Sequence, residues 1–262
     1  MNTTRIRREP PHFRRVEVRR VAPVSSRLLR VTLAGPEFEG FAVADPAASV
    51  RLLIPSVGRR QLVMPTWNGN EFLLADGRRP AIRTFTPRRF DPVALELDLD
   101  VVLHGHGAAA EWAGAADAGA ECAISGPGRG YAIDENARSF LLAGDETAIP
   151  AISQLTEAIP AGALVRIHLE VAQPDGRVAL PSHPRAEVDW HDLPDGARAG
   201  DTLVAAVEAS DLAGDERVWV AGEAAAVQRI RRHLFEERTL PRAQATVRGY
   251  WKFGRAGAGD DS

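Results

Sequence analysis

The segment Arg83–Arg88 (RTFTPR) combines two guanidinium groups, two hydroxyl groups and one aromatic ring. An arginine can hold a phosphate through the planar fork of its N–H donors. Alternate residues of a strand share a face, so the ring of Phe85 would lie on the same side as Arg83 and could stack on a flat cofactor. These residues therefore predict a cofactor contact, and an exposed basic strand end is the alternative interpretation.

A second candidate is the stretch Leu103–Trp112 (LHGHGAAAEW), in which an apolar strand leads into a helix start made of small residues. Backbone N–H groups at a helix start are unpaired and attract phosphate. The pair His104 and His106 also suggests metal binding, but two ligands on one turn without a third nearby make a poor metal site. We therefore expect a phosphate contact here and no metal.

Two further candidates follow apolar strands in the second half of the chain. Asp145, Glu146 and Thr147 come after SFLLAG, and Gly222 and Glu223 come after RVWVA. Ligands of open parallel sheets bind beyond the carboxyl ends of the strands, so both turns would lie where a dinucleotide crosses. Neither turn carries the GxGxxG pattern, and the acidic residues also suit a well-capped helix start. Both interpretations stay open at this point.

The elements that must position these residues differ between the two halves of the chain. Up to about residue 134, short apolar or alternating runs are separated by turn-forming residues, which predicts an antiparallel barrel or sandwich. We expect strands at 15–19, 28–33, 50–54, 72–74 and 95–103. The clearest is 95–103, with leucine and valine on one face and mostly acidic residues on the other.

After residue 134, strands and helices alternate, which predicts a parallel sheet with crossover helices. We expect strands at 139–143, 164–171 and 217–221, and helices at 148–158, 201–209 and 224–237. The chain therefore divides into a β-rich domain at 12–134 and an α/β domain at 135–254. The tail 255–262 (RAGAGDDS) is expected to be disordered.

Composition excludes several classes of protein. The 262 residues carry a formal net charge of −3, with 45% hydrophobic and 26% charged residues, which is typical of a globular protein and argues against nucleic-acid binding through bulk charge. The single cysteine, Cys122, excludes a disulfide framework and a cysteine-rich metal centre. No uncharged apolar run reaches about 18 residues, and the N-terminus has no apolar signal core. We therefore expect a cytoplasmic protein without membrane insertion.

Six motifs occur in a definite order between Phe13 and Gly254: RTFTPR, HGHGAAAEWA, GPGRG, AGDETAIPAI, WVAGEAAAV and GYWKFG. Their order and approximate separations resemble those found in the siderophore-interacting protein family. The members of this family are FAD-dependent ferric-siderophore reductases of the ferredoxin-reductase-like superfamily. The resemblance implies a six-stranded antiparallel FAD-binding barrel followed by an α/β domain of the NAD(P)-binding kind with a parallel sheet.

The resemblance also implies roles for individual residues. Arg83 would bind the FAD pyrophosphate with Thr84 beside it, whereas Phe85 and Thr86 are the candidate catalytic residues. Phe85 would pack on the flavin, and Thr86 would hydrogen-bond near its reactive nitrogen. The other implied cofactor contacts are the FAD phosphate turn (His104, Gly105, Gly107, Ala108 and Ala109), the NAD(P) turn (Asp145, Glu146 and Thr147), the nicotinamide neighbours Gly222 and Glu223, and Trp251, which with Tyr250 would border the flavin.

Three positions depart from the family pattern. Phe85 stands where tyrosine is commoner, which keeps a stacking ring but removes a hydroxyl group. His106 stands where an acidic residue is usual, and GPGRG at 126–130 carries an extra glycine. Each departure affects one contact and leaves the FAD prediction in place.

The implied reaction is a two-stage electron transfer, from NADH or NADPH to FAD and from the reduced flavin to a ferric siderophore. Siderophore oxygens hold the harder Fe(III) more tightly than Fe(II), so reduction loosens the metal. Ferric siderophores are often anionic, and the candidates for a cationic entrance are Arg88, Arg89, Lys252 and Arg255.

Several alternatives stay open at this point. Reduced ferredoxin could replace the pyridine nucleotide, and the choice between NADH and NADPH is not decided by the sequence. A general flavin reductase with another acceptor, or a siderophore-binding module without turnover, would also fit the residues.

Overall fold

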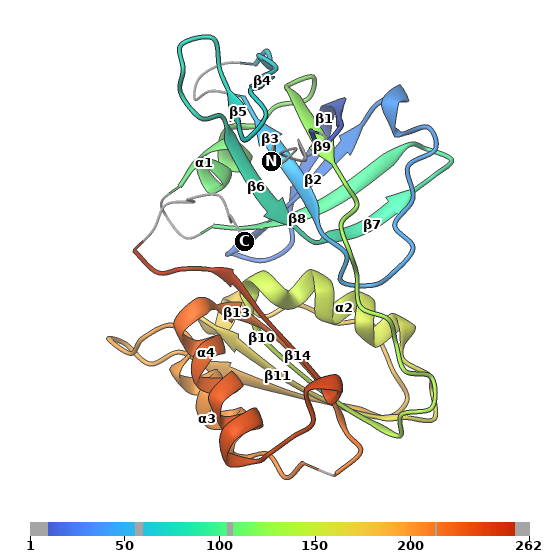
Figure 1. Cartoon of the computed structure of the whole chain (residues 1–262), viewed down its shortest axis with the longest axis vertical. Coiled ribbons are helices and arrows are strands. Elements are labelled where there is room, and N and C mark those ends of the chain that lie inside the picture. Colours follow the sequence, from blue (N-terminus) through green and yellow to red (C-terminus); the bar gives the residue numbers. More distant parts are fainter. Residues whose placement is uncertain (1–9, 56–59, 104–106, 213, 255–262) are drawn as a thin grey trace, which may run out of the picture.

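The computed structural model describes residues 10–55, 60–103, 107–212 and 214–254. Within these ranges the chain forms two lobes, an antiparallel sheet built by the first half and a parallel sheet with helices built by the second (Figure 1). The expected fold class is confirmed. The first sheet ends at Ser125 and the second begins at Ser139, so the boundary expected at 134–135 falls in the connection between them. The tail 255–262 lies outside the described residues.

The first lobe is a curled antiparallel sheet in the order β6-β3-β9-β1-β2-β8-β7. Its strands are β1 (Phe13–Pro23), β2 (Leu28–Ala34), β3 (Val50–Ile54), β6 (Ala81–Phe85), β7 (Pro87–Asp91), β8 (Glu96–Val102) and β9 (Glu121–Ser125), with a separate hairpin of β4 (Thr66–Trp67) and β5 (Phe72–Leu73). The two outermost strands, β6 and β7, are separated in the chain only by Thr86. The described sheet therefore has seven strands where six were expected, because the chain bends at Thr86 and β6 and β7 lie at opposite edges.

Strand β8 shows why the alternating sequence folds in this way. Leu97, Leu99 and Val101 are almost completely buried in the core of the first lobe. On the opposite face, Asp100 accepts two hydrogen bonds from Arg30 of β2, at 2.7 and 2.8 Å. The acidic face is therefore satisfied by the neighbouring strand, while the apolar face builds the core.

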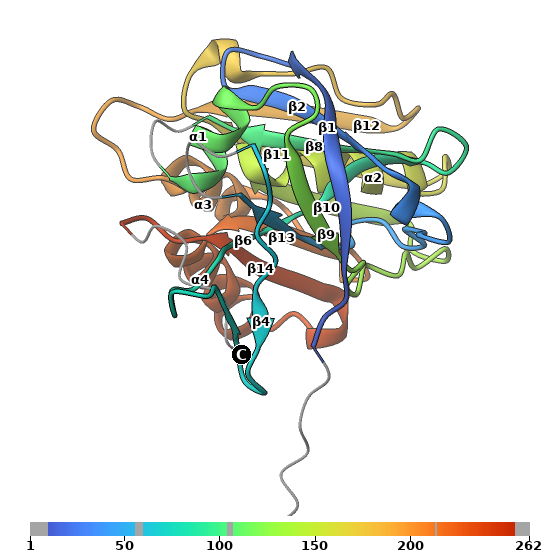
Figure 2. The same cartoon turned by 90° about the horizontal axis from the view of Figure 1, so that it is seen from above.

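The second lobe is a parallel sheet in the order β12-β11-β10-β13-β14. Its strands are β10 (Ser139–Asp145), β11 (Leu164–Val171), β12 (Ala186–Asp192), β13 (Arg217–Glu223) and β14 (Ala245–Trp251). Helix α2 (Ile149–Ala158) packs on one face of this sheet, and α3 (Asp201–Ala209) and α4 (Ala224–Arg232) pack on the other (Figure 1). Seen from above, β11, β10, β13 and β14 lie side by side in this order (Figure 2). The α4 helix continues as a π-helical turn over His233–Glu237.

The sequence did not predict β12 and β14, which form the two edges of the parallel sheet. In β12 the short apolar pattern is interrupted by Glu187, Asp189 and Asp192, all of which are exposed. Edge strands bury only part of their surface, so they need fewer apolar residues and give a weaker sequence pattern.

The two lobes share buried side chains. Leu28 and Ala47 of the first lobe belong to the same buried cluster as Ile149 of α2, which lies between the two sheets (Figure 1). An ion pair between Arg88 of β7 and Glu157 of α2 adds to this contact, with an N–O distance of 2.8 Å. Because the core is continuous, side chains from both lobes can build one site. No helix in the described part of the chain is long and apolar enough to cross a membrane.

Candidate functional site

The Asp145 carboxylate is the centre of a hydrogen-bond network at the carboxyl end of β10. Its Oδ1 accepts from the backbone N–H and the hydroxyl of Thr147, at 2.9 and 2.5 Å. Its Oδ2 accepts from the backbone N–H of Glu223 at 2.9 Å and from the indole N–H of Trp251 at 2.7 Å. Burial raises the pKa of Asp145 to about 6, whereas the hydrogen bonds it accepts favour the charged form. One carboxylate thus joins the ends of β10, β13 and β14.

Glu146 connects the two lobes. Its carboxylate accepts from Nε and Nη2 of Arg27, at 2.6 and 2.9 Å, and Arg27 lies in the turn between β1 and β2. It also accepts from the backbone N–H of Ala172 at 3.3 Å. The Glu146 side chain is only 8% exposed. The carboxylate expected to face a nucleotide is therefore engaged within the protein.

We expect Arg27→Ala to lower the free energy of unfolding by about 3–5 kcal/mol, because the buried Glu146 carboxylate loses its cationic partner. Denaturant unfolding measures the change. The control is Arg78→Ala, since the Arg78 side chain is 74% exposed and pairs with Asp76 at the surface. Its expected loss is about 0–1 kcal/mol. Equal losses in the two variants would contradict the interlobe role of Arg27.

Glu223 ends β13 and caps α4. Its Oε2 accepts from the backbone N–H groups of Ala225 and Ala226, at 2.6 and 3.0 Å, and the side chain is buried. The preceding Gly222 has no room for a side chain, because a Cβ there would lie 2.7 Å from Oδ2 of Asp145. The two residues expected near the nicotinamide therefore also build the packed edge of the sheet.

Gly144 allows β10 to approach its neighbours. A Cβ at this position would lie 2.3 Å from the Cβ of Ala148 and 2.9 Å from the carbonyl oxygen of Ala221. We expect Gly144→Ala to cost about 1–3 kcal/mol of stability, measured by denaturant unfolding. Gly162→Ala is the control, because a Cβ there meets nothing within 4 Å, and its effect should stay within about 0.5 kcal/mol. A Gly144→Ala protein as stable as this control would refute the close approach.

Thr86 lies at the bend between β6 and β7 and faces the second lobe. Its hydroxyl oxygen is 3.4 Å from that of Tyr250 on β14, and the Thr86 side chain is buried. Burial raises the pKa of Tyr250, so its hydroxyl keeps its proton at neutral pH. The structure thus brings together the predicted Thr86 and Tyr250 at the interface between the lobes, while the neighbouring Trp251 bonds to Asp145 at the sheet edge.

Arg83 is a half-buried cation on β6. It pairs in register with Leu52 of β3 and shares a face with Phe85. Its guanidinium donates to the carbonyl oxygen of Ile82 at 2.8 Å, and no carboxylate pairs with it within the described ranges of the chain. Burial lowers the pKa of Arg83. A half-buried cation without a protein anion is costly and fits a ligand phosphate. Phe85 packs against the core of the first lobe, and Thr84 is exposed.

The start of α1 (Ala108–Ala115) has no side-chain cap in the part of the chain that the structure describes. The preceding Gly107 has a φ of 105°, a conformation that favours glycine. The backbone N–H groups of Ala108 and Ala109 therefore lie at a helix start that can take an anion. The expected residues His104, Gly105 and His106 lie outside the described residues. Among the described residues, no cluster of His, Cys, Asp or Glu is arranged to hold a metal ion.

A hollow of about 650 Å³ lies beside this helix start. It is lined by Ala108 and Trp112 of α1, by Ala81 at the start of β6, and by Arg78 and Arg79 of the preceding loop. The concave surface of the first lobe therefore extends beyond the expected phosphate contacts and leaves room for a large ligand with an anionic part.

The four candidate cations of the entrance lie in different surroundings. Arg88 is paired with Glu157 through two hydrogen bonds, at 2.8 and 3.2 Å, and its side chain is 20% exposed. Arg89 and Lys252 are exposed. Arg255 lies outside the described residues. Arg88 is thus a contact between the lobes, whereas Arg89 and Lys252 present their charge to solvent.

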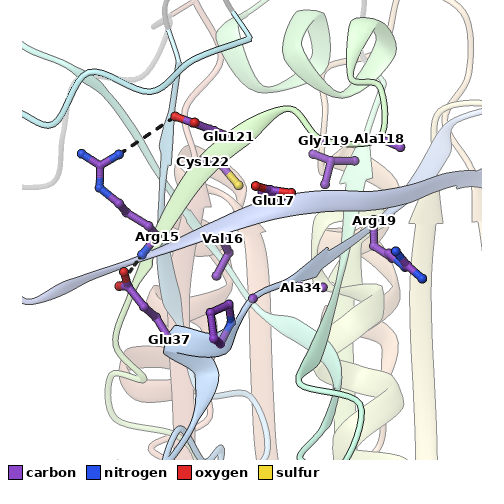
Figure 3. A pocket seen from close by; sticks show the side chains of 13 residues that line it. Arg15, Val16, Glu17, Arg19, Ala34, Glu37, Ala118, Gly119, Glu121 and Cys122 are labelled. Carbon is purple, nitrogen blue, oxygen red and sulfur yellow. Dashed lines mark hydrogen bonds and ion pairs between the residues drawn. The ribbon is translucent and has the colours of Figure 1, made fainter.

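A second hollow, of about 480 Å³, lies beside β1 and β9 (Figure 3). Arg15 at its rim lies 4.0 Å from Glu121, and the backbone N–H of Arg15 donates to Glu37 at 2.7 Å. Cys122 is buried at this hollow, and burial raises the pKa of its thiol. None of the residues expected in the site lines this hollow.

Glu170 and Arg27 also contribute to the candidate site and were not predicted from the sequence. Glu170 lies inside the expected strand 164–171, between Leu169 and Val171 on its polar face, so the alternating pattern accounts for it as an ordinary strand residue. Arg27 pairs with a residue 119 positions later in the chain. No local pattern marks such a contact.

An antiparallel curled sheet followed by a parallel α/β lobe is the ferredoxin-reductase-like fold. The chain belongs to the siderophore-interacting protein family. Residues 17–131 match the siderophore-interacting FAD-binding domain, and residues 137–254 match the siderophore-interacting protein domain. The resemblance inferred from the six motifs is thereby confirmed.

Three similar proteins show how far this relationship extends. An uncharacterized protein of Mycobacterium tuberculosis is 38% identical over 93% of this chain and 90% of its own length. The ferric vibriobactin reductase ViuB of Vibrio cholerae is 31% identical over 88% of this chain and 86% of its own. The crystal structure of a siderophore utilization protein from T. fusca has a TM-score of 0.84 and 32% identity, covering 96% of this chain and 97% of that one.

Proposed function

We propose that this protein is an FAD-dependent reductase that passes electrons from NADH or NADPH to a ferric siderophore inside the cell. The observation that carries the proposal is the half-buried Arg83, which has no carboxylate partner in the described residues, close in the chain to the Thr86 bend. The match of residues 17–131 to an FAD-binding domain and the similarity to a ferric vibriobactin reductase support it.

The residues of the first lobe fit FAD. Arg83 and the start of α1 at Gly107–Ala109 would hold the phosphates, since both offer N–H donors without a capping carboxylate in the described chain. Thr84 and Phe85 would complete the contact along β6, and the hollow beside α1 offers room for the rest of the cofactor. When bound, FAD supplies the capacity to accept a hydride and to donate single electrons.

The second lobe would complete the site from the opposite side. Thr86 would present its hydroxyl near the reactive flavin nitrogen, with Tyr250 as its hydrogen-bond neighbour. Trp251 is fixed by its hydrogen bond to Asp145 and would border the flavin face. The interface buries Thr86 and so limits the access of water to this hydroxyl. Lys252 follows directly and would offer an exposed positive charge to an anionic chelate.

The substrate chemistry needs one electron for each iron. Fe(III) bound by catecholate or hydroxamate oxygens becomes Fe(II), which these hard ligands hold far more weakly. No proton transfer by a Ser–His–Asp arrangement is required for this step, because the protein binds and orients the reacting groups.

Absorption spectroscopy of the purified protein tests the proposal first, because an oxidised flavin absorbs at about 370 and 450 nm. The protein is then reduced anaerobically with NADH or NADPH, and a ferric catecholate or hydroxamate chelate is added. We expect the flavin bands to bleach and then to return as Fe(II) is trapped by ferrozine.

Three results would contradict the proposal in different ways. A protein that cannot be reconstituted with FAD would indicate a binding module. A flavin that is reoxidised by free flavin but not by ferric chelates would indicate a general flavin reductase. If only reduced ferredoxin bleaches the flavin, then ferredoxin is the electron donor in place of NADH or NADPH.

A further inference from the structure

Buried carboxylates close the carboxyl edge of the parallel sheet. At the end of β11, Glu170 accepts from the backbone N–H groups of Gly200 and Thr202, at 2.6 and 3.1 Å, and so caps α3. Asp145 caps the helical turn before α2 in the same way, and Glu223 caps α4. All three acidic residues are at most 7% exposed. The helical turn before α2 and the helices α3 and α4 therefore each begin on a protein carboxylate.

This arrangement conflicts with the usual way in which α/β sheets bind a dinucleotide. The pyrophosphate normally accepts hydrogen bonds from unpaired backbone N–H groups at a helix start. Here several of those groups already donate to carboxylates: Thr147 to Asp145, Gly200, Thr202 and Leu203 to Glu170, and Ala225 and Ala226 to Glu223. Pro150 removes another donor from the first turn of α2 because proline has no N–H. A diphosphate at this edge would find few free donors and would meet buried negative charge.

The turn after β10 is also filled by side chains. The Arg27–Glu146 ion pair lies over it, and the backbone N–H of Ala172 donates to the same carboxylate. Gly176 packs so closely that a Cβ there would lie 2.8 Å from Oε1 of Glu146. The first turn of the sheet, where a dinucleotide would approach most closely, is therefore occupied by the protein itself.

The first lobe contrasts with this sheet edge, because its proposed phosphate-binding groups are not paired with carboxylates in the described residues. The start of α1 carries no side-chain cap in the described residues, and Arg83 on β6 has no carboxylate partner there. The features that attract phosphate thus gather in the first lobe, and the features that repel it gather at the sheet edge of the second.

We infer that this protein recognises a pyridine-nucleotide donor without its diphosphate. This inference rests on the proposed function and specifies its donor. Recognition ends at the dihydronicotinamide and its ribose, so dihydronicotinamide mononucleotide (NMNH) serves about as well as NADH. NADPH is equivalent to NADH for the same reason, because its additional phosphate lies at the adenosine end of the molecule.

The kinetic test uses the FAD-loaded protein under anaerobic conditions and follows flavin bleaching with NADH, NADPH and NMNH. We expect the three values of kcat/KM to agree within tenfold. One charge-assisted contact to a phosphate is worth about tenfold or more in affinity. An NMNH value more than tenfold below that of NADH or NADPH would therefore overturn the inference.

A binding experiment tests the same inference without requiring turnover. ADP-ribose, which carries the diphosphate and adenosine but no nicotinamide, is titrated calorimetrically into the FAD-loaded protein while the flavin spectrum reports cofactor retention. We expect no binding up to about 1 mM. A dissociation constant of this size corresponds to a binding free energy of only about −4 kcal/mol, so even weak binding would be detected. Tighter binding with FAD retained would overturn the inference even if the reductase activity is found.

The two tests separate this inference from the proposed function. If none of the three nucleotides bleaches the flavin but the dithionite-reduced protein still reduces a ferric chelate, the NAD(P)H donor of the proposed function is wrong. The inference about the donor then falls with it. If the nucleotides do bleach the flavin, ADP-ribose binding or a low NMNH value overturns the inference alone and leaves the proposed function in place.

Discussion

Arg83→Ala is expected to leave the purified protein largely without bound FAD. Arg83 is half-buried, and the only hydrogen bond of its guanidinium within the described chain goes to the neighbouring carbonyl oxygen of Ile82. Charge-assisted hydrogen bonds to a phosphate contribute about 1.5–3 kcal/mol, so the affinity for FAD should fall about ten- to a hundredfold. Flavin absorbance per protein and titration of the apoprotein with FAD measure the loss.

Two comparisons make this result specific. Arg19→Ala removes an arginine of β1 whose side chain is 70% exposed, and it should retain FAD as the unchanged protein does. The free energy of unfolding of apo Arg83→Ala should not fall, because this guanidinium pairs with no carboxylate in the described residues. Full FAD retention by Arg83→Ala would remove Arg83 from the cofactor site.

Asp145→Ala is expected to give the largest loss of stability at the sheet edge. The substitution leaves the indole N–H of Trp251, the backbone N–H of Glu223 and the donors of Thr147 without their acceptor in a buried region. Each buried unsatisfied donor costs about 1–3 kcal/mol, so the total should reach at least about 3 kcal/mol in denaturant unfolding. The exposed Asp195→Ala serves as the control and should change stability by less than about 0.5 kcal/mol. A loss as small as that of the control would disprove the network.

The pH dependence of stability tests the burial of the same carboxylate. Burial raises the pKa of Asp145 from 3.8 to about 6, so between these values the folded protein holds this proton more tightly than the unfolded chain does. The stabilisation is complete below the lower value and is lost as the pH rises through the upper one. The free energy of unfolding should therefore fall from about pH 4 to pH 6 relative to Asp145→Asn. A constant difference between the two proteins over this range would contradict the raised pKa.

The order of the two sheets could be predicted because the apolar residues of their strands are spaced differently in the sequence. Leu97, Leu99 and Val101 alternate with acidic residues that Arg30 and Thr32 satisfy, which is the pattern of a two-faced antiparallel strand. The buried central strands β10 and β13 instead read as continuous apolar runs. The edge strands β12 and β14 carry neither pattern strongly, and the sequence did not reveal them.

The candidate site could be predicted only in its local parts. A carboxylate that follows an apolar strand, such as Asp145 or Glu223, is visible in the sequence, and so is a basic and aromatic segment such as Arg83–Phe85. Whether such a carboxylate faces a nucleotide or caps a helix depends on the donors around it, and only the structure shows that the N–H groups of Glu223 and Ala225 point to these side chains. Contacts between the lobes depend on packing that no local pattern encodes.

The edge strand β12 of the parallel sheet has a consequence for how this protein behaves in concentrated solution. An open strand edge is a template on which another molecule can add a strand and begin to aggregate. Glu187 and Asp189 are exposed along β12, so a second copy added in parallel register would bring like charges together. The same acidic residues that weaken the strand pattern in the sequence therefore disfavour self-association of the sheet through this edge.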